Sequence, residues 1–483
     1  MNSNSQWQET FPNGRGSVTY CFTGPRASAS GLFGLLQLFA GLALLSAPLF
    51  AQNRYILETS TPADLPRITS QYGLTLVDTI HEDTASLYVV SLPSSATAAQ
   101  EVAAVQADPA VLEFVPDSEV EAGDNFLDTP GKGRPLDPLS DVLALQGTAS
   151  YYGVPVLYAY VAQTATNLIH LTATQQQFPT GNDIVADIDT GVDPNHPLLS
   201  GVLVSGYDFI NNVPGIPNEL AGLSQSTVAI LDQSTVAILD QKNTPLVLNQ
   251  STVAILDQST VAILDGTKLP QAFGHGTMVA GLIHLVAPTA QIMPLRAFQL
   301  DGTANLSDVI RAIYYAVDHN ARVINMSFST TTNSSDMMQA INYATNHGVV
   351  LIAAAGNDGK EMTVYPAAFE GVFGVGSTDK SDFRSPFSNY GDSVRLSAPG
   401  EALVTAYPGN NYAAVWGTSF STALVSGASA LITSLQPLIN PASLGPVFAQ
   451  GPLLGYEEPK PRLDLLPSML YSSQQNYSIP SDY

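Results

Sequence analysis

Three short segments of the chain carry side chains that together could activate a serine. Asp189 follows an apolar run and precedes Thr-Gly, His275 lies in Gly-His-Gly-Thr, and Ser419 lies in Gly-Thr-Ser-Phe-Ser. A serine hydroxyl barely ionises near neutral pH, so it needs a base beside it and a third group that orients the base. Imidazole titrates close to neutrality without perturbation, which makes His275 the candidate base. In the chain order Asp, His, Ser, these residues can supply the three roles of a catalytic triad.

Each segment also has a purely structural interpretation when it is taken alone. A carboxylate after a strand is a weak signal, and Ser419 could simply cap the helix that follows it. Four other aspartates also follow apolar runs, in repeated Val-Ala-Ile-Leu segments, but none of them precedes Thr-Gly. Asp189 is therefore preferred over Asp232, Asp240, Asp257 and Asp265. The remaining histidines lack flanking glycines and are expected at surface or ordinary polar positions: His81, His170, His196, His284, His319 and His347.

The elements that must position these segments alternate between strand and helix. Apolar runs at 184–188, 322–326 and 349–354 predict buried strands, and a helix is expected to begin with Ser307 as its cap and another to span 336–347. This alternation is typical of an α/β fold with a doubly wound, mainly parallel sheet and flanking helices, here over residues 142–470. Active sites in such sheets form at the carboxyl ends of the strands. A polar tail is expected at 471–483.

The N-terminal region predicts export. Residues 31–50 are uncharged and apolar and are preceded by Arg15 and Arg26, which is typical of a secretory signal peptide spanning 1–51. Its removal would also remove Cys21, the single cysteine. The alternative is an uncleaved membrane anchor, because about 20 apolar residues can just span a bilayer.

A small α+β unit is expected at 52–122. Strand patterns at 54–58, 86–92 and 111–115 enclose a helical pattern at 97–107. Residues 123–141 are rich in Gly, Pro and Asp and are interpreted as a linker.

An eight-residue repeat interrupts the α/β pattern. The sequence QSTVAILD occurs four times, at 225–232, 233–240, 250–257 and 258–265, within a predicted insertion at 223–266. Two interpretations stay open: a duplication tolerated in a surface loop, or a β-ribbon that shapes a cleft or binds a partner.

Composition excludes several classes of function. Of the 483 residues 45% are hydrophobic and only 12% are charged, which excludes a solvated disordered chain. The formal net charge of −24 disfavours binding to nucleic acid or to anionic lipid. One cysteine allows neither a disulfide framework nor a thiolate metal cage within the chain.

Over residues 151–469 the chain resembles the subtilisin-like serine proteases, the subtilases. The matching segments are DTGVD at 189–193, GHGTMVAG at 274–281, VINMS at 323–327, AAAGN at 353–357, YPAA at 365–368, FSNYG at 387–391, APG at 398–400 and GTSFS at 417–421. The resemblance implies that Ser419 is the nucleophile, His275 the general base and then acid, and Asp189 the orienting carboxylate. It also implies that Asn357 and the Ser419 backbone N–H form the oxyanion hole.

Further expectations come from the same resemblance. Backbone at Ser327, Phe328 and Ser329 and at Ala354, Ala355 and Gly356 would bind an extended protein or peptide substrate. The unit at 52–122 is similar to the ferredoxin-like subtilase propeptide, an intramolecular inhibitor that is cut off. The protein would be a secreted, monomeric, self-processing endopeptidase that requires no cofactor for its chemistry. No metal site is assigned, although structural calcium sites are common in the family.

The chain departs from the family pattern in three places. Ala423 stands where Pro is usual, Ser329 stands where Gly is usual, and 86 residues separate Asp189 from His275. None of these changes removes a reacting group, so altered specificity is expected. Two other functions remain open: a non-catalytic surface protein that binds through the repeats, and a membrane-anchored protease.

Overall fold

The computed structural model describes residues 53–81, 86–93, 98–121, 135–178, 181–221, 253–255, 270, 272–454 and 460–475. The predicted signal peptide and the first part of the predicted linker lie outside these residues. So do three of the four repeat copies and the last part of the predicted tail.

An eight-stranded sheet forms the centre of the larger part of the chain, in the order β10-β9-β12-β8-β14-β15-β16-β17. Every pairing in it is parallel except that of β9 with β10. The strands are β8 Ile184–Asp189, β9 Gly206–Asp208, β10 Val213–Gly215, β12 Gln291–Arg296, β14 Val323–Met326, β15 Val350–Ala354, β16 Val372–Thr378 and β17 Leu396–Pro399. The strands predicted at 184–188, 322–326 and 349–354 are therefore the three adjacent strands β8, β14 and β15.

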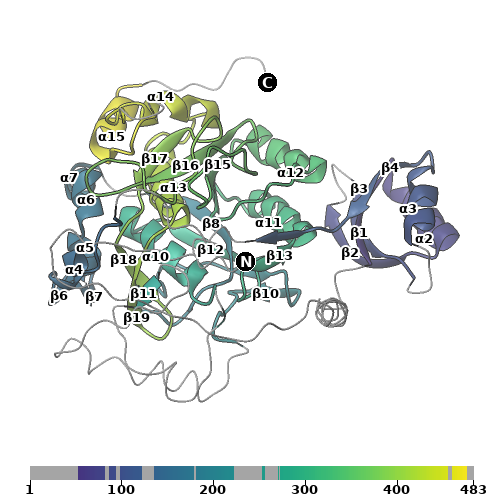
Figure 1. Cartoon of the computed structure of the whole chain (residues 1–483), viewed down its shortest axis with the longest axis horizontal. Helices are drawn as coiled ribbons and strands as arrows, with labels where there is room; N and C mark the ends of the chain where they lie inside the picture. Colours follow the sequence, from purple (N-terminus) through teal and green to yellow (C-terminus); the bar gives the residue numbers. More distant parts are fainter. Residues whose placement is uncertain are drawn as a thin grey trace, which may run out of the picture. The chain divides into compact units, whose positions relative to one another are not determined.

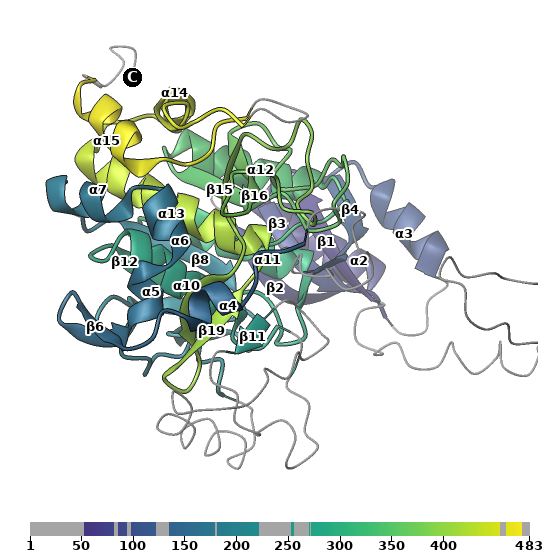
Figure 2. The ribbon, with the colours of Figure 1, turned by 60° about the vertical axis from the view of Figure 1, so that its left-hand side comes forward.

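Helices cover both faces of this sheet (Figures 1 and 2). On β14, Val323 packs in one core with α10 His275–Val286 and α13 Thr418–Leu435. The next residue, Ile324, packs in a second core with α11 Leu306–Asp318 and α12 Ser335–Asn346. Because successive strand residues face opposite sides, the two cores confirm the predicted doubly wound arrangement.

The N-terminal α+β unit has its own four-stranded antiparallel sheet, in the order β2-β3-β1-β4. Its elements are β1 Arg54–Thr59, η1 Pro62–Asp64, α2 Leu65–Tyr72, β2 Thr75–His81, β3 Ser86–Ser91, α3 Ala98–Gln106 and β4 Val111–Pro116. The order β-α-β-β-α-β is that of the ferredoxin-like motif. One face of the sheet shares its core with α11 and α12, and β5 Glu119–Glu121 pairs with β13 Thr303–Asn305.

Where α11 begins, the structure differs from the sequence prediction. Asn305, not Ser307, is the residue that caps α11, and its side chain makes no capping hydrogen bond. Ser307 lies inside the first turn, where its N–H and hydroxyl both donate to Asp117 of the N-terminal unit, at 2.9 and 2.7 Å. The acceptor for this helix end therefore comes from a distant segment that no local pattern could reveal.

One copy of the repeat contributes a short strand. β11 Val253–Ile255 pairs antiparallel with β19 Asn411–Val415, which pairs in turn with β18 Leu403–Tyr407. This places Val253–Ile255, three residues of the third copy, beside the strand that leads into the Gly-Thr-Ser segment.

The remaining elements pack around the first core. They are α4 Ser140–Leu143, β6 Thr148–Tyr151, β7 Val154–Leu157, α5 Tyr158–Ala162, α6 Thr164–Leu168, α7 Leu171–Gln177, η4 Pro441–Ser443, α14 Leu444–Phe448 and α15 Leu465–Ser473. The tail was expected to begin at residue 471, but α15 continues to Ser473. Ser472 is buried and its carbonyl accepts a 2.9 Å hydrogen bond from Gln436, which ties this last turn to the end of α13.

Among the described residues, α13 is long and apolar enough to cross a membrane. However, 89% of the window that meets this criterion is buried inside the protein, as expected for a central core helix.

Candidate active site

Strand β8 and helix α10 bring Asp189 and His275 together at the carboxyl edge of the sheet. Asp189 is the last residue of β8 and His275 the first of α10. Both carboxylate oxygens of Asp189 lie 2.8 Å from His275 Nδ1, and Oδ1 also accepts from the Thr190 N–H at 2.7 Å. Both side chains are buried. The carboxylate therefore fixes Nδ1 as the protonated nitrogen and leaves Nε2 as the basic one.

Glycines permit this close approach of strand and helix. Gly274 precedes the helix with φ +86°, and a Cβ on it would lie 2.7 Å from the Tyr407 ring. A Cβ on Gly276 would lie 2.0 Å from the Gly191 carbonyl oxygen and 3.2 Å from Asp189 Cβ. The flanking glycines of the Gly-His-Gly-Thr segment are thus required by packing.

Ser419 lies in the first turn of α13, which packs against α10. Its hydroxyl donates to the Ser327 carbonyl at 3.0 Å, and the Ser327 hydroxyl donates to the Ser419 carbonyl at 3.0 Å. The imidazole of His275 lies 5.6 Å from the ring of Phe420, the residue after Ser419, measured between centroids. The fold therefore brings the predicted serine to the same sheet edge as the Asp189–His275 pair.

Asn357 follows β15 and is oriented by the start of α13. Its Oδ1 accepts from the Thr418 N–H at 2.9 Å and from the Thr418 hydroxyl at 3.0 Å. Because both bonds use the oxygen, they assign Nδ2 as the donor atom of this amide. These two bonds therefore hold the side-chain amide of Asn357 against Thr418, the residue that precedes Ser419.

The two predicted substrate-binding segments lie at the ends of the paired strands β14 and β15: the first follows β14, and the second begins with Ala354, the last residue of β15. Phe328 is buried against Phe298, with ring centroids 5.0 Å apart, and Ala354 and Ala355 are also buried. Ser329 is half-buried, and its hydroxyl would lie 3.1 Å from a Cβ on Gly356, which has φ +86°. Because most of these side chains pack inward, these segments offer mainly backbone groups to a ligand.

Glu219, a buried carboxylate that no sequence motif indicated, joins two of the motifs. Glu219 accepts from the Thr190 hydroxyl, from the Thr277 hydroxyl at 2.5 Å and from the Gly276 N–H at 3.3 Å. Burial raises the pKa of Glu219 to about 7, against the lowering effect of the two threonine hydroxyls. Glu219 therefore binds residues that lie next to Asp189 and next to His275 in the sequence. The one sequence feature that could have pointed to Glu219 is its place as an acidic residue shortly before the repeat insertion.

A second buried acid, Asp187, lies two residues before Asp189 on the same strand. Its Oδ1 accepts from Asn325 Nδ2 at 2.9 Å, and Asn325 Oδ1 accepts from the Ser426 hydroxyl at 2.7 Å. Burial, and then the charge of Asp189, raise the pKa of Asp187 well above its usual range. Asp187 therefore belongs to a buried polar network inside the sheet.

Several other histidines are buried rather than at the surface. His196 Nε2 donates to the Asn411 carbonyl oxygen at 3.0 Å, and Nδ1 accepts from the Leu198 N–H at 3.3 Å. Burial lowers the pKa of His196, and it lowers that of His284 to about 4. His81 stacks on Tyr314, with centroids 4.2 Å apart. These three are polar core positions, and the hydrogen bonds described for them do not involve Asp189.

Comparison with known proteins identifies relatives of the region that holds this site. Residues 181–448 match the family described as the subtilase family, Peptidase_S8. The chain is 34% identical over 260 residues to a thermophilic serine proteinase of Bacillus sp. (strain AK1), covering 52% of each chain. It is 33% identical over 260 residues to thermitase of Thermoactinomyces vulgaris, covering 52% of this chain and 74% of thermitase. The chain thus spans about half the length of the first of these relatives.

A solved structure has the same fold. Fervidolysin from Fervidobacterium pennivorans, described as a keratinolytic enzyme related to subtilisin, aligns with a TM-score of 0.61 and 19% identity. The alignment covers 86% of this chain and 61% of fervidolysin. At this identity the likeness concerns the fold alone.

Proposed function

The chain belongs to the subtilase family, and on that premise we propose that it is a serine endopeptidase that cuts protein or peptide substrates through an acyl-enzyme. The observation that carries the proposal is the buried Asp189–His275 pair: His275 begins α10, which packs against α13, and the first turn of α13 holds Ser419. An imidazole that a carboxylate orients is the base that a serine nucleophile requires.

In the proposed reaction Ser419 Oγ attacks the carbonyl carbon of the scissile bond while His275 Nε2 takes the hydroxyl proton. His275 then gives this proton to the leaving amine, and the acyl group remains on Ser419. A water molecule, deprotonated by His275, releases the acid product and restores the serine. Asp189 stays ionised and stabilises the imidazolium in both halves. None of these steps uses a cofactor.

The developing oxyanion would be stabilised by Asn357 Nδ2 and the Ser419 N–H. The bonds from Thr418 to Asn357 Oδ1 support this role, because they hold the donor in place before the substrate arrives. Changing Asn357→Ala is expected to lower kcat by about 10²–10³-fold with little change in KM. Steady-state kinetics on a peptide substrate measures this.

The N-terminal unit, in this proposal, is an inhibitory propeptide that the mature enzyme loses. Its core is shared with α11 and α12, which supports a role in folding and inhibition of the larger part. Cleavage is expected within residues 119–141, after export directed by residues 1–51. The mature protein would then be an extracellular monomer.

Two measurements test the function. A serine-directed phosphonate should label the wild-type protein once, at Ser419, and should not label Ser419→Ala. Intact mass and N-terminal sequence should show that the wild type loses everything up to the linker while Ser419→Ala keeps residues from 52 onward. A folded wild-type protein that takes up no phosphonate and cuts no peptide would refute the proposal.

A further inference from the structure

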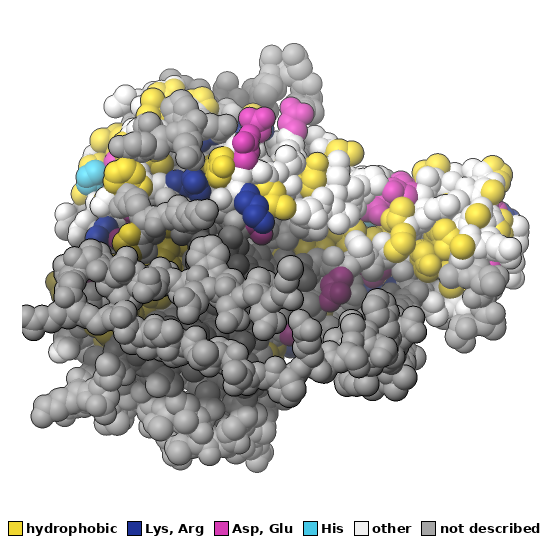
Figure 3. Space-filling model, viewed as in Figure 1, with side chains coloured by type: hydrophobic (Ala, Val, Ile, Leu, Met, Phe, Trp, Pro, Cys, Tyr) yellow, Lys and Arg dark blue, Asp and Glu magenta, His cyan; other side chains and the backbone are white. Residues whose placement is uncertain are grey.

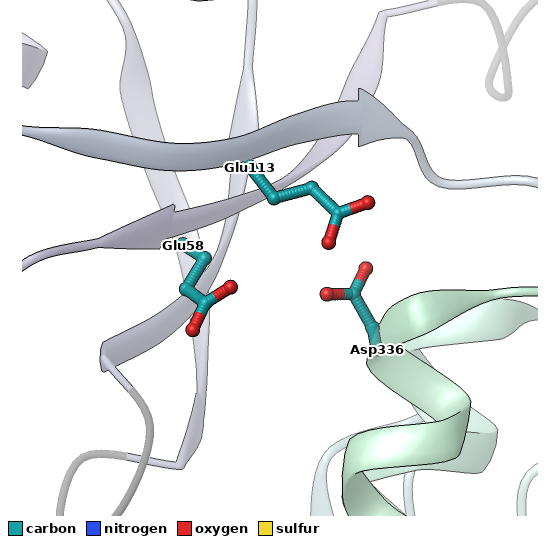
Figure 4. A group of neighbouring side chains, drawn as sticks. All are labelled: Glu58, Glu113 and Asp336. Carbon is teal, nitrogen blue, oxygen red and sulfur yellow. The ribbon is translucent and has the colours of Figure 1, made fainter. Parts of the chain in front are cut away.

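Three carboxylates meet where the N-terminal unit contacts α12. Glu58 lies on β1, Glu113 on β4 and Asp336 in the first turn of α12, and Figure 4 shows the three carboxyl groups pointing toward one another. One oxygen of each lies within 4.8 Å of an oxygen of the other two. Like charges this close repel strongly unless something neutralises them.

Asp336 is the member that no donor group reaches in the described part of the chain. It is 1% exposed, and neither of its carboxylate oxygens accepts a hydrogen bond from an N–H or hydroxyl group of the described residues. The two glutamates each accept one bond from α12: Ser335 Oγ donates to Glu113 at 2.6 Å and Gln339 Nε2 donates to Glu58 at 3.3 Å. A buried carboxylate with no donor is rare and calls for a positive group that faces it.

Protein side chains do not supply that positive charge in the described part of the chain, where no salt bridge joins any of the three carboxylates to Lys, Arg or His. The nearest basic side chain of β1, Arg54, is already paired with Asp117 at 3.0 Å. The N-terminal end of α12 favours negative charge, but a helix end carries only about half an elementary charge. Burial, the charges of the two glutamates and a close carboxyl–carboxyl contact with Glu113 accordingly raise the pKa of Asp336 to about 7.

We propose that Glu58, Glu113 and Asp336 bind a divalent cation of the Ca²⁺ type, which ties the N-terminal unit to α12. Hard cations of this type take six to eight oxygen ligands at about 2.3–2.6 Å in flexible geometry, and the separation of the three oxygens allows all of them to reach one ion. Water would complete the shell on the half-buried glutamate side. This site is independent of the proposed protease activity, because its ligands lie on β1, β4 and α12.

The test measures Ca²⁺ binding rather than activity. The full chain carrying Ser419→Ala, which stays whole even if the protein processes itself, is stripped with a chelator and titrated with CaCl2 by calorimetry at about pH 8, where Asp336 is ionised. The same chain with the additional change Asp336→Asn is expected to bind one Ca²⁺ fewer. The lost site is expected to have a dissociation constant of about 0.1–1 mM. Any other calcium sites are counted in both proteins and cancel.

The control is Glu370→Gln, which removes an exposed carboxylate next to Gly371, at the other end of α12, and should leave the number of bound ions unchanged. Circular dichroism checks folding, and Glu58→Gln should reproduce the loss if Asp336→Asn misfolds. In chelator, Asp336→Asn should melt at the same or a higher temperature, because a repulsion is removed, whereas Ca²⁺ should raise the melting temperature of the parent alone. Equal Ca²⁺ stoichiometry in the parent and both variants would overturn the proposal and point to a shared proton instead.

Discussion

Glu219 links the residues that flank the Asp189–His275 pair, although it touches neither side chain through a described hydrogen bond. Its partners are the hydroxyls of Thr190 and Thr277 and the N–H of Gly276. All of them are buried, so removal of the carboxylate would take away the acceptor of the Thr277 hydroxyl. The Thr190 hydroxyl and the Gly276 N–H would keep only their longer bonds, to Asp189 Oδ1 at 3.2 Å and to Thr190 Oγ1 at 3.1 Å. We therefore interpret Glu219 as a positioning residue for the proposed triad.

The variant Glu219→Ala should lower kcat by about 10²-fold and change KM little, because it loosens the imidazole without touching the substrate. Glu219→Gln keeps the shape and one acceptor and should recover part of the loss. Steady-state kinetics of the mature enzyme distinguishes the two variants. A raised KM with unchanged kcat would instead place Glu219 in substrate binding.

At the scale of elements, the packing of α10 against α13 sets how the segments of His275 and Ser419 meet. Gly427 is the contact point: a Cβ there would lie 2.7 Å from Val286 Cβ and 2.9 Å from the Ile283 carbonyl oxygen. Neither neighbour is the end of a flexible side chain, so one of the helices would have to move.

Accordingly, Gly427→Ala should destabilise the protein by about 1–3 kcal/mol and lower activity, despite the higher helix propensity of alanine. Gly445→Ala is the matched control, since it also lies in a helix but nothing comes within 4 Å of its Cβ. That change should be neutral or stabilising by up to about 1 kcal/mol. Urea unfolding of both variants in the Ser419→Ala chain measures the difference. Equal effects would argue against a packing role for Gly427.

The contact between Asp117 and α11 ties the N-terminal unit to a helix of the larger part. Asp117 accepts from Ser307 and from Arg54 Nε at 3.0 Å, and is buried. Asp117→Ala should weaken the attachment of the N-terminal unit to the larger part by about 1–2 kcal/mol, which is what the loss of a helix cap costs. In the Ser419→Ala chain, an added protease should then remove the N-terminal unit at lower urea concentration. Asp64→Ala, which removes an acid outside this contact, should not have this effect.

At the scale of the whole molecule, the described acidic side chains on the face in Figure 3 do not gather into one patch. They are scattered over both the N-terminal unit and the larger part. The net charge of −24 therefore acts mainly through general repulsion, while the acids that titrate unusually are inside.

Three buried carboxyl groups make stability depend on pH. Burial raises the pKa values of Glu219, Asp336 and Glu401 to about 7, against ordinary values of 4.5 for Glu and 3.8 for Asp. Between these values the folded state holds more protons than the unfolded state, so stability should fall as pH rises from about 4.5 to about 7. His284, with its pKa lowered to about 4, gives the opposite slope below 6.5 and partly offsets the fall there.

Urea unfolding of the Ser419→Ala chain, in chelator, at about pH 5, 6 and 7 measures this dependence. The variant Glu401→Gln should flatten it, because one of the carboxyl groups with a raised pKa no longer titrates. An unchanged slope in that variant would show that Glu401 does not carry a raised pKa.

The sequence by itself determined the strands that hold the site. The apolar runs before Asp189, Ser327 and Asn357 predict β8, β14 and β15 to within about two residues, because burial of a parallel strand leaves a continuous local pattern. It also singled out Asp189, His275 and Ser419, since their motifs are short and contiguous. The roles of these residues remain predictions, supported by the geometry that brings them to one edge.

Only the tertiary structure decided which distant groups meet. Glu219 is 30 residues from Asp189, Asp117 serves a helix 190 residues away, and the carboxylates of Glu58, Glu113 and Asp336 come from three separate elements. No local periodicity encodes such encounters, because they depend on how the two sheets and the helices between them pack. Burial in that packing, and not residue type, also separates the acids that titrate near neutrality from the many on the surface.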